Sequence, residues 1–164
     1  MKSLYIIRHA KSSWGDFTLP DFERPLNDRG KKDAPLMAQR LLDKKIRMDV
    51  FISSPAKRAL KTCKIFCSEY KKKEENIIVV DELYHASVQT FYKVVSSIDD
   101  AYETAAIFSH NPGITDFVNS LGLDMKIDNM PTCGIFGVAL PSAGWKQFAK
   151  AEKKFLLFEY PKLL

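Results

Sequence analysis

The sequence lacks the features that mark several common classes of protein. Its 164 residues include only three cysteines and three histidines. They contain no HExxH or CxxC metal motif and no GxxxxGK[ST] phosphate loop. No apolar run approaches the roughly 18 residues that a membrane-spanning helix requires. We therefore expect no cofactor, no metal, no P-loop nucleotide site and no membrane partner.

The cysteines indicate no disulfide framework. Cys63 and Cys67 stand one turn apart on a predicted helix, where small buried side chains are common. The chain passes from Met1-Lys2-Ser3 straight into an apolar run, which leaves no room for a signal peptide. We therefore expect a protein of the reducing cytoplasm.

Charge and composition are those of an ordinary globular protein. Hydrophobic residues make up 46% and charged residues 27%, with a net charge of +5. We expect a single domain over residues 1–164. The lysines form short separate clusters, which are typical of solvated helix faces, so we expect no nucleic-acid partner. The positive excess suits anionic substrates.

Two apolar runs end abruptly in histidine. Leu4-Tyr5-Ile6-Ile7 is followed by Arg8 and His9, and Ala105-Ala106-Ile107-Phe108 is followed by Ser109 and His110. Short continuous apolar runs predict strands buried on both faces of a parallel sheet. A histidine at a strand end is often only a hydrogen-bonded residue of the core or rim. Two of them at matching positions favour a functional site.

A third strand is predicted over residues 49–53, and it brings an arginine to the same place. Ser54-Pro55 follows it, a pair that is typical of a helix N-terminus, with serine as the cap. Arg58 then lies in the first turn of that helix. The alternative interpretation is that Arg58 is an ordinary surface residue. Because ligands bind outside the carboxyl ends of parallel strands, we expect Arg8, His9, Arg58 and His110 to meet at one edge.

The rest of the chain predicts alternating helices and strands. Asn27 is the expected cap of a helix that ends near Lys45. Further helices are expected over residues 88–98 and 111–121, and strands over residues 77–80, 104–109, 133–140 and 155–160. Residues 11–26 form a loop that carries Trp14, Phe17 and Phe22. Such aromatics usually cap the core, although they can also line the entrance to a site.

The four converging side chains predict a cationic pocket. Its natural ligand is a phosphoryl dianion, whose oxygens accept paired hydrogen bonds from guanidinium groups. An imidazole can act as a nucleophile, and neighbouring positive charge keeps it neutral.

These residues also resemble the histidine phosphatase superfamily. Arg8-His9-Ala10 is similar to that family's Arg-His-Gly signature, with alanine in place of the commoner glycine. Ser53-Ser54-Pro55 with Arg58, Ala59 and Thr62 resembles its second block, and Ser109-His110 resembles its third. The small size, the start Arg-His-Ala-Lys-Ser and the segment Phe-Glu-Tyr-Pro-Lys near the C-terminus are similar to the phosphohistidine phosphatase SixA branch.

The resemblance implies a fold and a set of roles. The fold would be an α/β three-layer sandwich of the phosphoglycerate mutase type, with a mixed, mostly parallel sheet and helices on both faces. His9 would be the nucleophile that becomes phosphorylated, and no metal would be used. Arg8, Arg58 and His110 would bind the phosphoryl group. Glu82 is the carboxylate nearest to the family's proton donor, and an exposed or helix-capping role is the alternative.

The resemblance also implies a substrate class. A phosphohistidine in a protein is the expected substrate, since the chain lacks the long insertions that enclose a sugar phosphate. The alternatives are a phosphatase of small phosphate esters and a module that binds a phosphorylated ligand without turnover. The sequence leaves the oligomeric state open.

Overall fold

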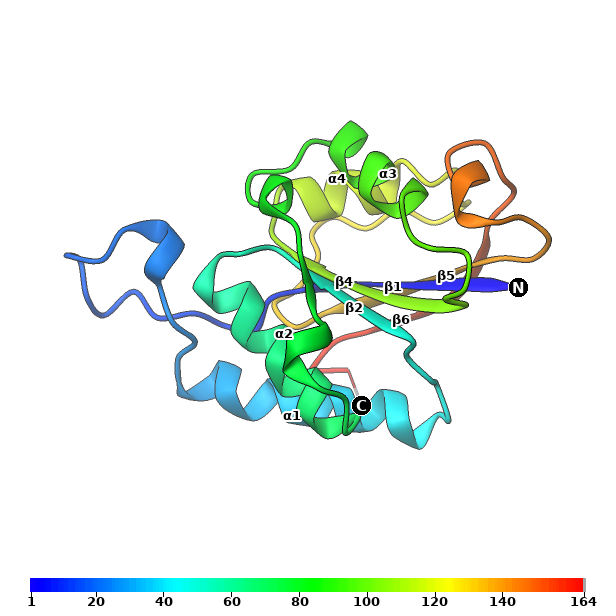
Figure 1. Cartoon of the computed structure of the whole chain (residues 1–164). Helices are drawn as coiled ribbons and strands as arrows, with labels where there is room; N and C mark the ends of the chain where they lie inside the picture. The colour runs from blue at the N-terminus through cyan, green and yellow to red at the C-terminus, as the bar shows by residue number, and fades with distance from the viewer. Residues whose placement is uncertain (164) are drawn as a thin grey trace.

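The computed structural model describes residues 1–163 and contains one six-stranded mixed sheet between two pairs of helices (Figure 1). The strands are β1 (Lys2–Arg8), β2 (Val50–Ser53), β3 (Ile78–Val79), β4 (Thr104–Ser109), β5 (Ile135–Leu140) and β6 (Lys154–Glu159). The helices are α1 (Asp28–Asp43), α2 (Lys57–Glu69), α3 (Val88–Ser96) and α4 (Gly113–Asn119).

The strand order is β3-β2-β4-β1-β5-β6. β1, β2, β3 and β4 pair in parallel, whereas β5 pairs antiparallel with both β1 and β6. The expected α/β three-layer sandwich with a mixed, mostly parallel sheet is thus confirmed, as is the antiparallel last strand.

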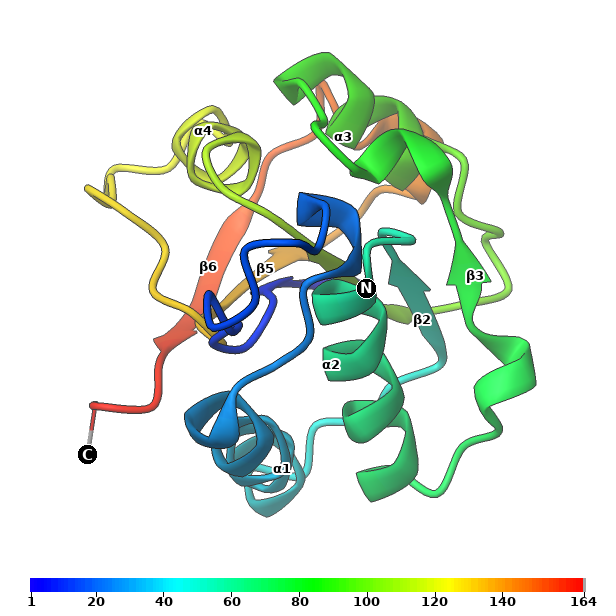
Figure 2. The same cartoon turned by 90° about the vertical axis from the view of Figure 1, so that its left-hand side faces the viewer.

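Each face of the sheet has its own hydrophobic core. Leu4 and Ile6 of β1 pack into the core beneath α3 and α4, whereas Tyr5 and Ile7 pack into the core against α1 and α2. Figure 2 shows the two helix pairs on opposite sides of the sheet. Because successive side chains of a strand alternate between faces, a central strand with a core on each side must be apolar throughout. The continuous apolar run of β1 has this cause.

The register aligns the carboxyl ends of the central strands. Arg8 lies opposite Ser109 on β4, and Ser53 of β2 lies opposite Phe108. The residues that follow these strands therefore start from one edge, as predicted. β3 is shorter than expected, with two residues whose side chains are about half exposed at the edge of the sheet.

Two helix starts differ from the sequence prediction. α2 begins at Lys57, because the backbone of Ala56 is still extended (ψ 139°), and the Ser54 hydroxyl accepts from the Ala56 amide at 3.2 Å in the turn before the helix. α4 begins at Gly113, one residue after Pro112, and the Asn111 side chain accepts from the Thr115 hydroxyl instead of capping a backbone amide. Asn27 does cap α1, since its side chain accepts from the Gly30 amide at 2.9 Å.

Candidate active site

The structure brings Arg8, His9, Arg58 and His110 together, as the sequence predicts. Arg8 ends β1, His9 follows it, and His110 follows β4. The rings of His9 and His110 lie 5.2 Å apart between centroids. Arg58 lies in the first turn of α2 and is only 5% exposed, so it is not an ordinary surface arginine.

The hydrogen bonds of His9 fix which ring nitrogen carries the proton. Nδ1 lies 2.7 Å from the carbonyl oxygen of Ala10, which can only accept, so Nδ1 is the donor. The other nitrogen, Nε2, accepts a long hydrogen bond of 3.3 Å from Nε of Arg58. The lone pair of Nε2 therefore points to the side of the ring where the guanidinium lies.

His9 is neutral at physiological pH. Burial, together with the positive charges of Arg58 and Arg8, lowers the pKa of His9 to about 3, and the hydrogen bond to Ala10 offsets only part of this. A neutral imidazole with a free lone pair can attack an electrophile.

His110 is held by a hydroxyl from the neighbouring strand. Its Nε2 lies 2.7 Å from Oγ of Ser54, which already accepts from the Ala56 amide. We assign the Ser54 hydroxyl as the donor to Nε2, because no other acceptor lies within reach of its proton among the described residues, and this assignment leaves the ring proton of His110 on Nδ1. Burial, with the neighbouring His9 and Arg58, lowers the pKa of His110 to about 2.

Two donors of the site lack a partner. Arg8 donates from Nη1 to the carbonyl of Met130 at 2.8 Å, but its Nε is buried without an acceptor. Nδ1 of His110 is likewise buried and unpaired. Within residues 1–163 these are the two buried side-chain nitrogen or oxygen atoms without a hydrogen bond. Buried polar groups are normally paired, so both donors fit an anionic ligand at this point.

Asp21 is a site residue that the sequence analysis missed. It lies in a 3-10 turn (η1, Asp21–Glu23) of the loop after β1 and forms an ion pair of 3.0 Å with Nη2 of Arg58. Its carboxylate also accepts from the Tyr84 hydroxyl at 2.6 Å and from Arg24 at 3.1 Å. Partial burial alone would raise the pKa of Asp21, but the hydrogen bonds from Tyr84 and Arg58 hold it well below its usual range. Asp21 is therefore ionised and orients Arg58.

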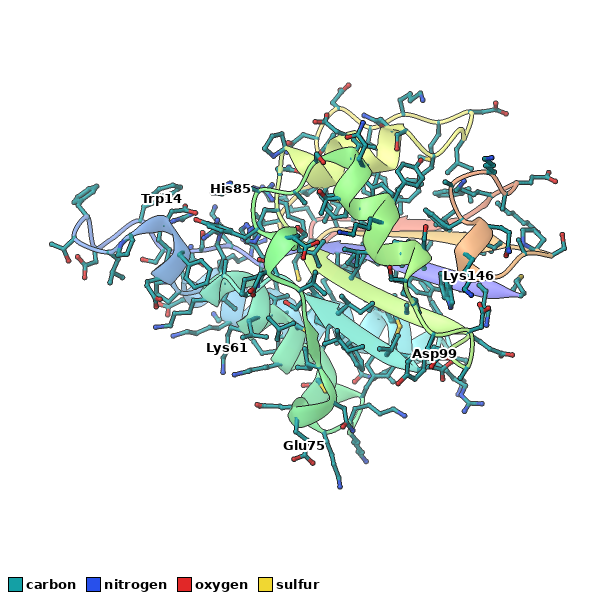
Figure 3. All side chains as sticks on the ribbon, turned by 45° about the horizontal axis from the view of Figure 1, so that its top comes forward. Trp14, Lys61, Glu75, His85, Asp99 and Lys146 are labelled. Carbon is teal, nitrogen blue, oxygen red and sulfur yellow. The ribbon has the colours of Figure 1, made fainter. Side chains whose placement is uncertain are left out.

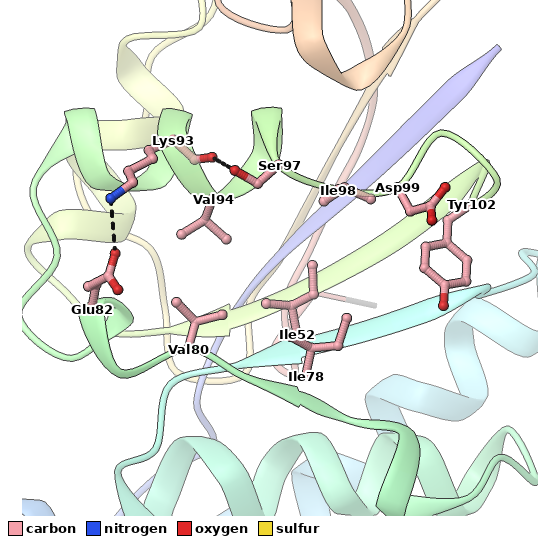
Figure 4. Close-up of a pocket in the computed structure, with 10 residues that line it drawn as sticks. All are labelled: Ile52, Ile78, Val80, Glu82, Lys93, Val94, Ser97, Ile98, Asp99 and Tyr102. Atoms are coloured by element: carbon pink, nitrogen blue, oxygen red, sulfur yellow. Dashed lines mark hydrogen bonds and ion pairs between the residues drawn. The ribbon is translucent and has the colours of Figure 1, made fainter.

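The structure does not bring Glu82 to the other predicted residues. It lies in another 3-10 turn (η3, Asp81–Leu83), and its carboxylate forms an ion pair of 3.6 Å with Lys93. Figure 4 shows this pair at one end of an apolar hollow of about 390 Å³, with Asp99 and Tyr102 at the other end. Glu82 is therefore an exposed residue, which was the alternative. Tyr84, two residues further along the chain, is the residue that packs beside His110.

Thr62 connects the loop after β1 to α2. Its hydroxyl donates to the Arg58 carbonyl at 2.8 Å and accepts from the Ala10 amide at 3.0 Å. The position of His9 relative to Arg58 is thus fixed by a buried side chain as well as by the sheet.

The aromatic residues of the loop after β1 do not all cap the core. Phe22 packs edge-to-face on Tyr84, but Trp14 is 69% exposed and Phe17 is 94% exposed. The expectation that these two cover the core is wrong. Sequence pattern alone cannot separate an aromatic that caps a core from one that faces solvent.

Among the described residues, no group of three or more histidine, cysteine or acidic side chains is placed to hold a metal ion. None of the described helices is both long enough and apolar enough to cross a membrane.

Two parallel strands that are each followed by a histidine, beside a buried arginine in the first turn of α2, are the features of a class of phosphate-handling proteins, the histidine phosphatases. The chain belongs to the histidine phosphatase superfamily (branch 1), whose family model matches residues 4–91.

Sequence relatives cover this chain to different extents. An uncharacterized chloroplastic protein of Arabidopsis thaliana is 27% identical over 88% of this chain and 75% of its own length. Phosphoserine phosphatase 1 of Hydrogenobacter thermophilus is 37% identical over 49% of this chain and 40% of its own length.

Solved structures share the fold along the whole chain. The SixA protein of Agrobacterium tumefaciens superposes with a TM-score of 0.83 at 23% identity, covering 98% of both chains. A protein histidine phosphatase SixA complexed with tungstate gives 0.82 at 20% identity, covering 97% of both chains. A mycobacterial glucosyl-3-phosphoglycerate phosphatase gives 0.67 at 13% identity, covering 94% of this chain and 96% of that one.

Proposed function

We propose that this chain is a metal-independent phosphatase that removes the phosphoryl group from phosphohistidine in proteins. The observation that carries the proposal is the pair of unpaired buried donors, Arg8 Nε and His110 Nδ1, beside the neutral His9. An unpaired buried donor costs about 1–3 kcal/mol, and an anionic acceptor removes that cost. A phosphoryl group offers three terminal oxygens and an electrophilic phosphorus atom.

The reaction we propose has two displacements. The lone pair of His9 Nε2 attacks phosphorus, and the bond from phosphorus to the substrate imidazole breaks. The imidazole leaves with that electron pair and takes a proton from solvent. Water then attacks the phosphorus of phosphorylated His9 and gives a proton to solvent. The bond from phosphorus to Nε2 breaks, its electron pair returns to Nε2 as the lone pair of neutral His9, and inorganic phosphate leaves.

Arg58 has a particular part in the first displacement. Its Nε–H occupies the lone pair of His9 at 3.3 Å, a long hydrogen bond that is weak enough to exchange. A phosphoryl oxygen is a stronger, charged acceptor. When the substrate binds, the guanidinium transfers its hydrogen bond to that oxygen and frees Nε2 to attack.

The leaving group favours phosphohistidine over phosphate esters. An alkoxide leaving group requires a proton from a well-placed acid. Asp21 is held ionised by Arg58 and Tyr84, and Glu82 pairs with Lys93 at a separate hollow, so neither supplies that proton. An imidazole takes up a proton near neutral pH without a dedicated acid. The structural likeness to a SixA protein that binds tungstate, a tetrahedral oxyanion like phosphate, is consistent with this proposal.

A comparison of substrates tests the proposal. We expect kcat/KM for a histidine phosphotransfer domain, phosphorylated with phosphoramidate, to exceed that for glycerol phosphate by at least about two orders of magnitude, the scale of general acid catalysis. Both are assayed at one pH and one salt concentration. If glycerol phosphate or a sugar phosphate is the better substrate, the phosphohistidine assignment is wrong.

Phosphatase activity on small phosphate esters is the second candidate. It is favoured by the 37% identity, over 49% of this chain, with phosphoserine phosphatase 1 of Hydrogenobacter thermophilus. Turnover of p-nitrophenyl phosphate, whose leaving group requires no acid, is expected under both candidates. Its absence would instead favour a module that only binds phosphorylated ligands.

A further inference from the structure

The loop between β1 and α1 presents apolar side chains beside the candidate active site. Trp14, Phe17 and Leu19 are 69%, 94% and 37% exposed, and they lie within six residues of one another. Figure 1 shows this blue segment projecting away from the sheet and helices, and Figure 3 shows Trp14 on it. Exposed aromatics gathered on one surface are typical of a binding surface.

The loop is held in place by contacts of its own. The guanidinium of Arg24 lies 3.5 Å from the centre of the Trp14 ring, and its Nη1 donates to Ser12 at 2.7 Å. The backbone of Thr18 donates to the Asp16 carboxylate at 2.9 Å, which closes a turn beside Phe17. Trp14 and Phe17 are therefore exposed on an ordered loop.

The same loop reaches the nucleophile through a chain of polar contacts. Arg24 binds Asp21 at 3.1 Å, Asp21 binds Arg58 at 3.0 Å, and Arg58 binds His9 at 3.3 Å. A surface that docks on Trp14 and Phe17 is thereby placed at a fixed position relative to His9.

We propose that Trp14 and Phe17 form the docking surface for the protein that carries the phosphorylated histidine. This inference rests on the proposed function. Tryptophan and arginine are the side chains that most often dominate the energetics of a protein interface. The proposed phosphoryl site consists of Arg8, Arg58 and His110, and Trp14 is joined to Arg58 through Arg24 and Asp21, so a small substrate at His9 does not require Trp14.

Charge argues against a membrane as the occupant. Residues 12–25 contain the acidic side chains Asp16, Asp21 and Glu23 and a single basic one, Arg24. Loops that insert into anionic lipid surfaces are rich in lysine and arginine. A protein surface with apolar side chains around its phosphohistidine fits this loop better.

Two substrates with the same scissile bond test the proposal. The first substrate is a histidine phosphotransfer domain that has been phosphorylated with phosphoramidate, and the second is free phosphohistidine. Both are assayed with the wild type, with Phe17→Ala and with the double variant Trp14→Ala/Phe17→Ala. Leu36→Ala on α1 is the control, because Leu36 is also an exposed apolar residue, at 48%. We expect the ratio of kcat/KM for the domain to that for free phosphohistidine to fall about tenfold in the double variant. Phe17→Ala should give part of this fall and Leu36→Ala none.

The outcomes separate this inference from the proposed function. If the wild type prefers the domain and the ratio does not change in the double variant, the docking surface is wrong and the function stands. If the wild type turns over p-nitrophenyl phosphate but not the domain, both are wrong. A wild-type dimer that dissociates in the double variant, or sedimentation of the wild type with phosphatidylserine vesicles, would also overturn the docking proposal.

Discussion

At the scale of single residues, the two histidines of the site are neutral because of where the strands put them. The burial of His9 and His110 next to Arg58 lowers their pKa values to about 3 and about 2. A lowered pKa means that the folded protein does not protonate the ring until the pH falls far below the ordinary value of about 6.5. In unfolded chains the same rings take up protons below about pH 6.5. Stability from this source is therefore lost as the pH falls from about 6.5 towards 3.

This state of the rings can be observed directly. We expect the ring nitrogen signals of His9 and His110, measured by NMR, to stay those of neutral imidazole as the pH is lowered from about 7.5 to about 5. The His9 signals should also report a proton on Nδ1, because Ala10 accepts it. Variants His9→Gln and His110→Gln assign the signals. Titration of either ring between about pH 6 and 7 would contradict the structure.

Asp21 gives a second prediction at this scale. Asp21→Asn removes the charge that orients Arg58, and we expect kcat/KM to fall by about tenfold, a moderate loss because the carboxylate is partly exposed. The loss should be equal for p-nitrophenyl phosphate and glycerol phosphate, since Asp21 acts through Arg58. Asp16→Asn in the same loop is the control and should have no effect. A loss confined to glycerol phosphate would make Asp21 a proton donor.

Sequence reasoning found the site residues that a strand end or a helix start positions. Arg8, His9 and His110 follow apolar runs, and Arg58 follows a helix start, so their meeting point follows from parallel pairing. Asp21 lies in an irregular loop whose course is set by the side-chain contacts of Arg24, and no periodic pattern reveals such contacts. Glu82 and Tyr84 lie in one short segment, yet Tyr84 packs beside His110 and Glu82 pairs with Lys93, a difference that the sequence pattern does not reveal.

At the scale of elements, helix starts were the least predictable feature. Ser54 and Asn111 both carry side chains that cap helices in many proteins, yet here they bind Ala56 and Thr115. The sequence shows the capacity to accept a hydrogen bond, whereas tertiary structure decides which donor comes within reach. In the case of Ser54, the hydroxyl also supports His110, so a position that looked like a cap is part of the site.

The contact between α1 and the segment after β1 gives a prediction for this scale. A Cβ added at Gly30 would lie 2.2 Å from the carbonyl oxygen of Lys11, two residues after His9. We expect Gly30→Ala to destabilise the protein by about 1–3 kcal/mol, the range for overpacking. Gly15→Ala is the matched control, because its Cβ would meet only Ser13, at 3.4 Å. Equal unfolding midpoints for the two variants in urea would contradict this packing.

At the scale of the whole molecule, the continuous apolar runs predicted strands buried on both faces of a parallel sheet, and the family resemblance implied the three-layer sandwich with a mixed sheet. Burial on both faces explains the continuous apolar sequence of strands such as β1. The antiparallel strands β5 and β6 complete the sheet on the other side of β1. The exposure of the loop between β1 and α1 was not predictable, because Trp14 and Phe17 are large aromatic residues of the kind that usually lies in a core. The same exposure is the basis for proposing that this loop is the docking surface for the protein substrate.

The central claim is that His9 carries the phosphoryl group during turnover. The direct measurement is intact-protein mass spectrometry after brief exposure to phosphoramidate or a phosphorylated substrate, followed by peptide mapping under neutral conditions. We expect one phosphate on His9, labile to acid and stable to base, and none in His9→Ala, which should remain folded and lose turnover. Turnover near the wild-type rate in His9→Ala, or a phosphate on another residue, would contradict the account.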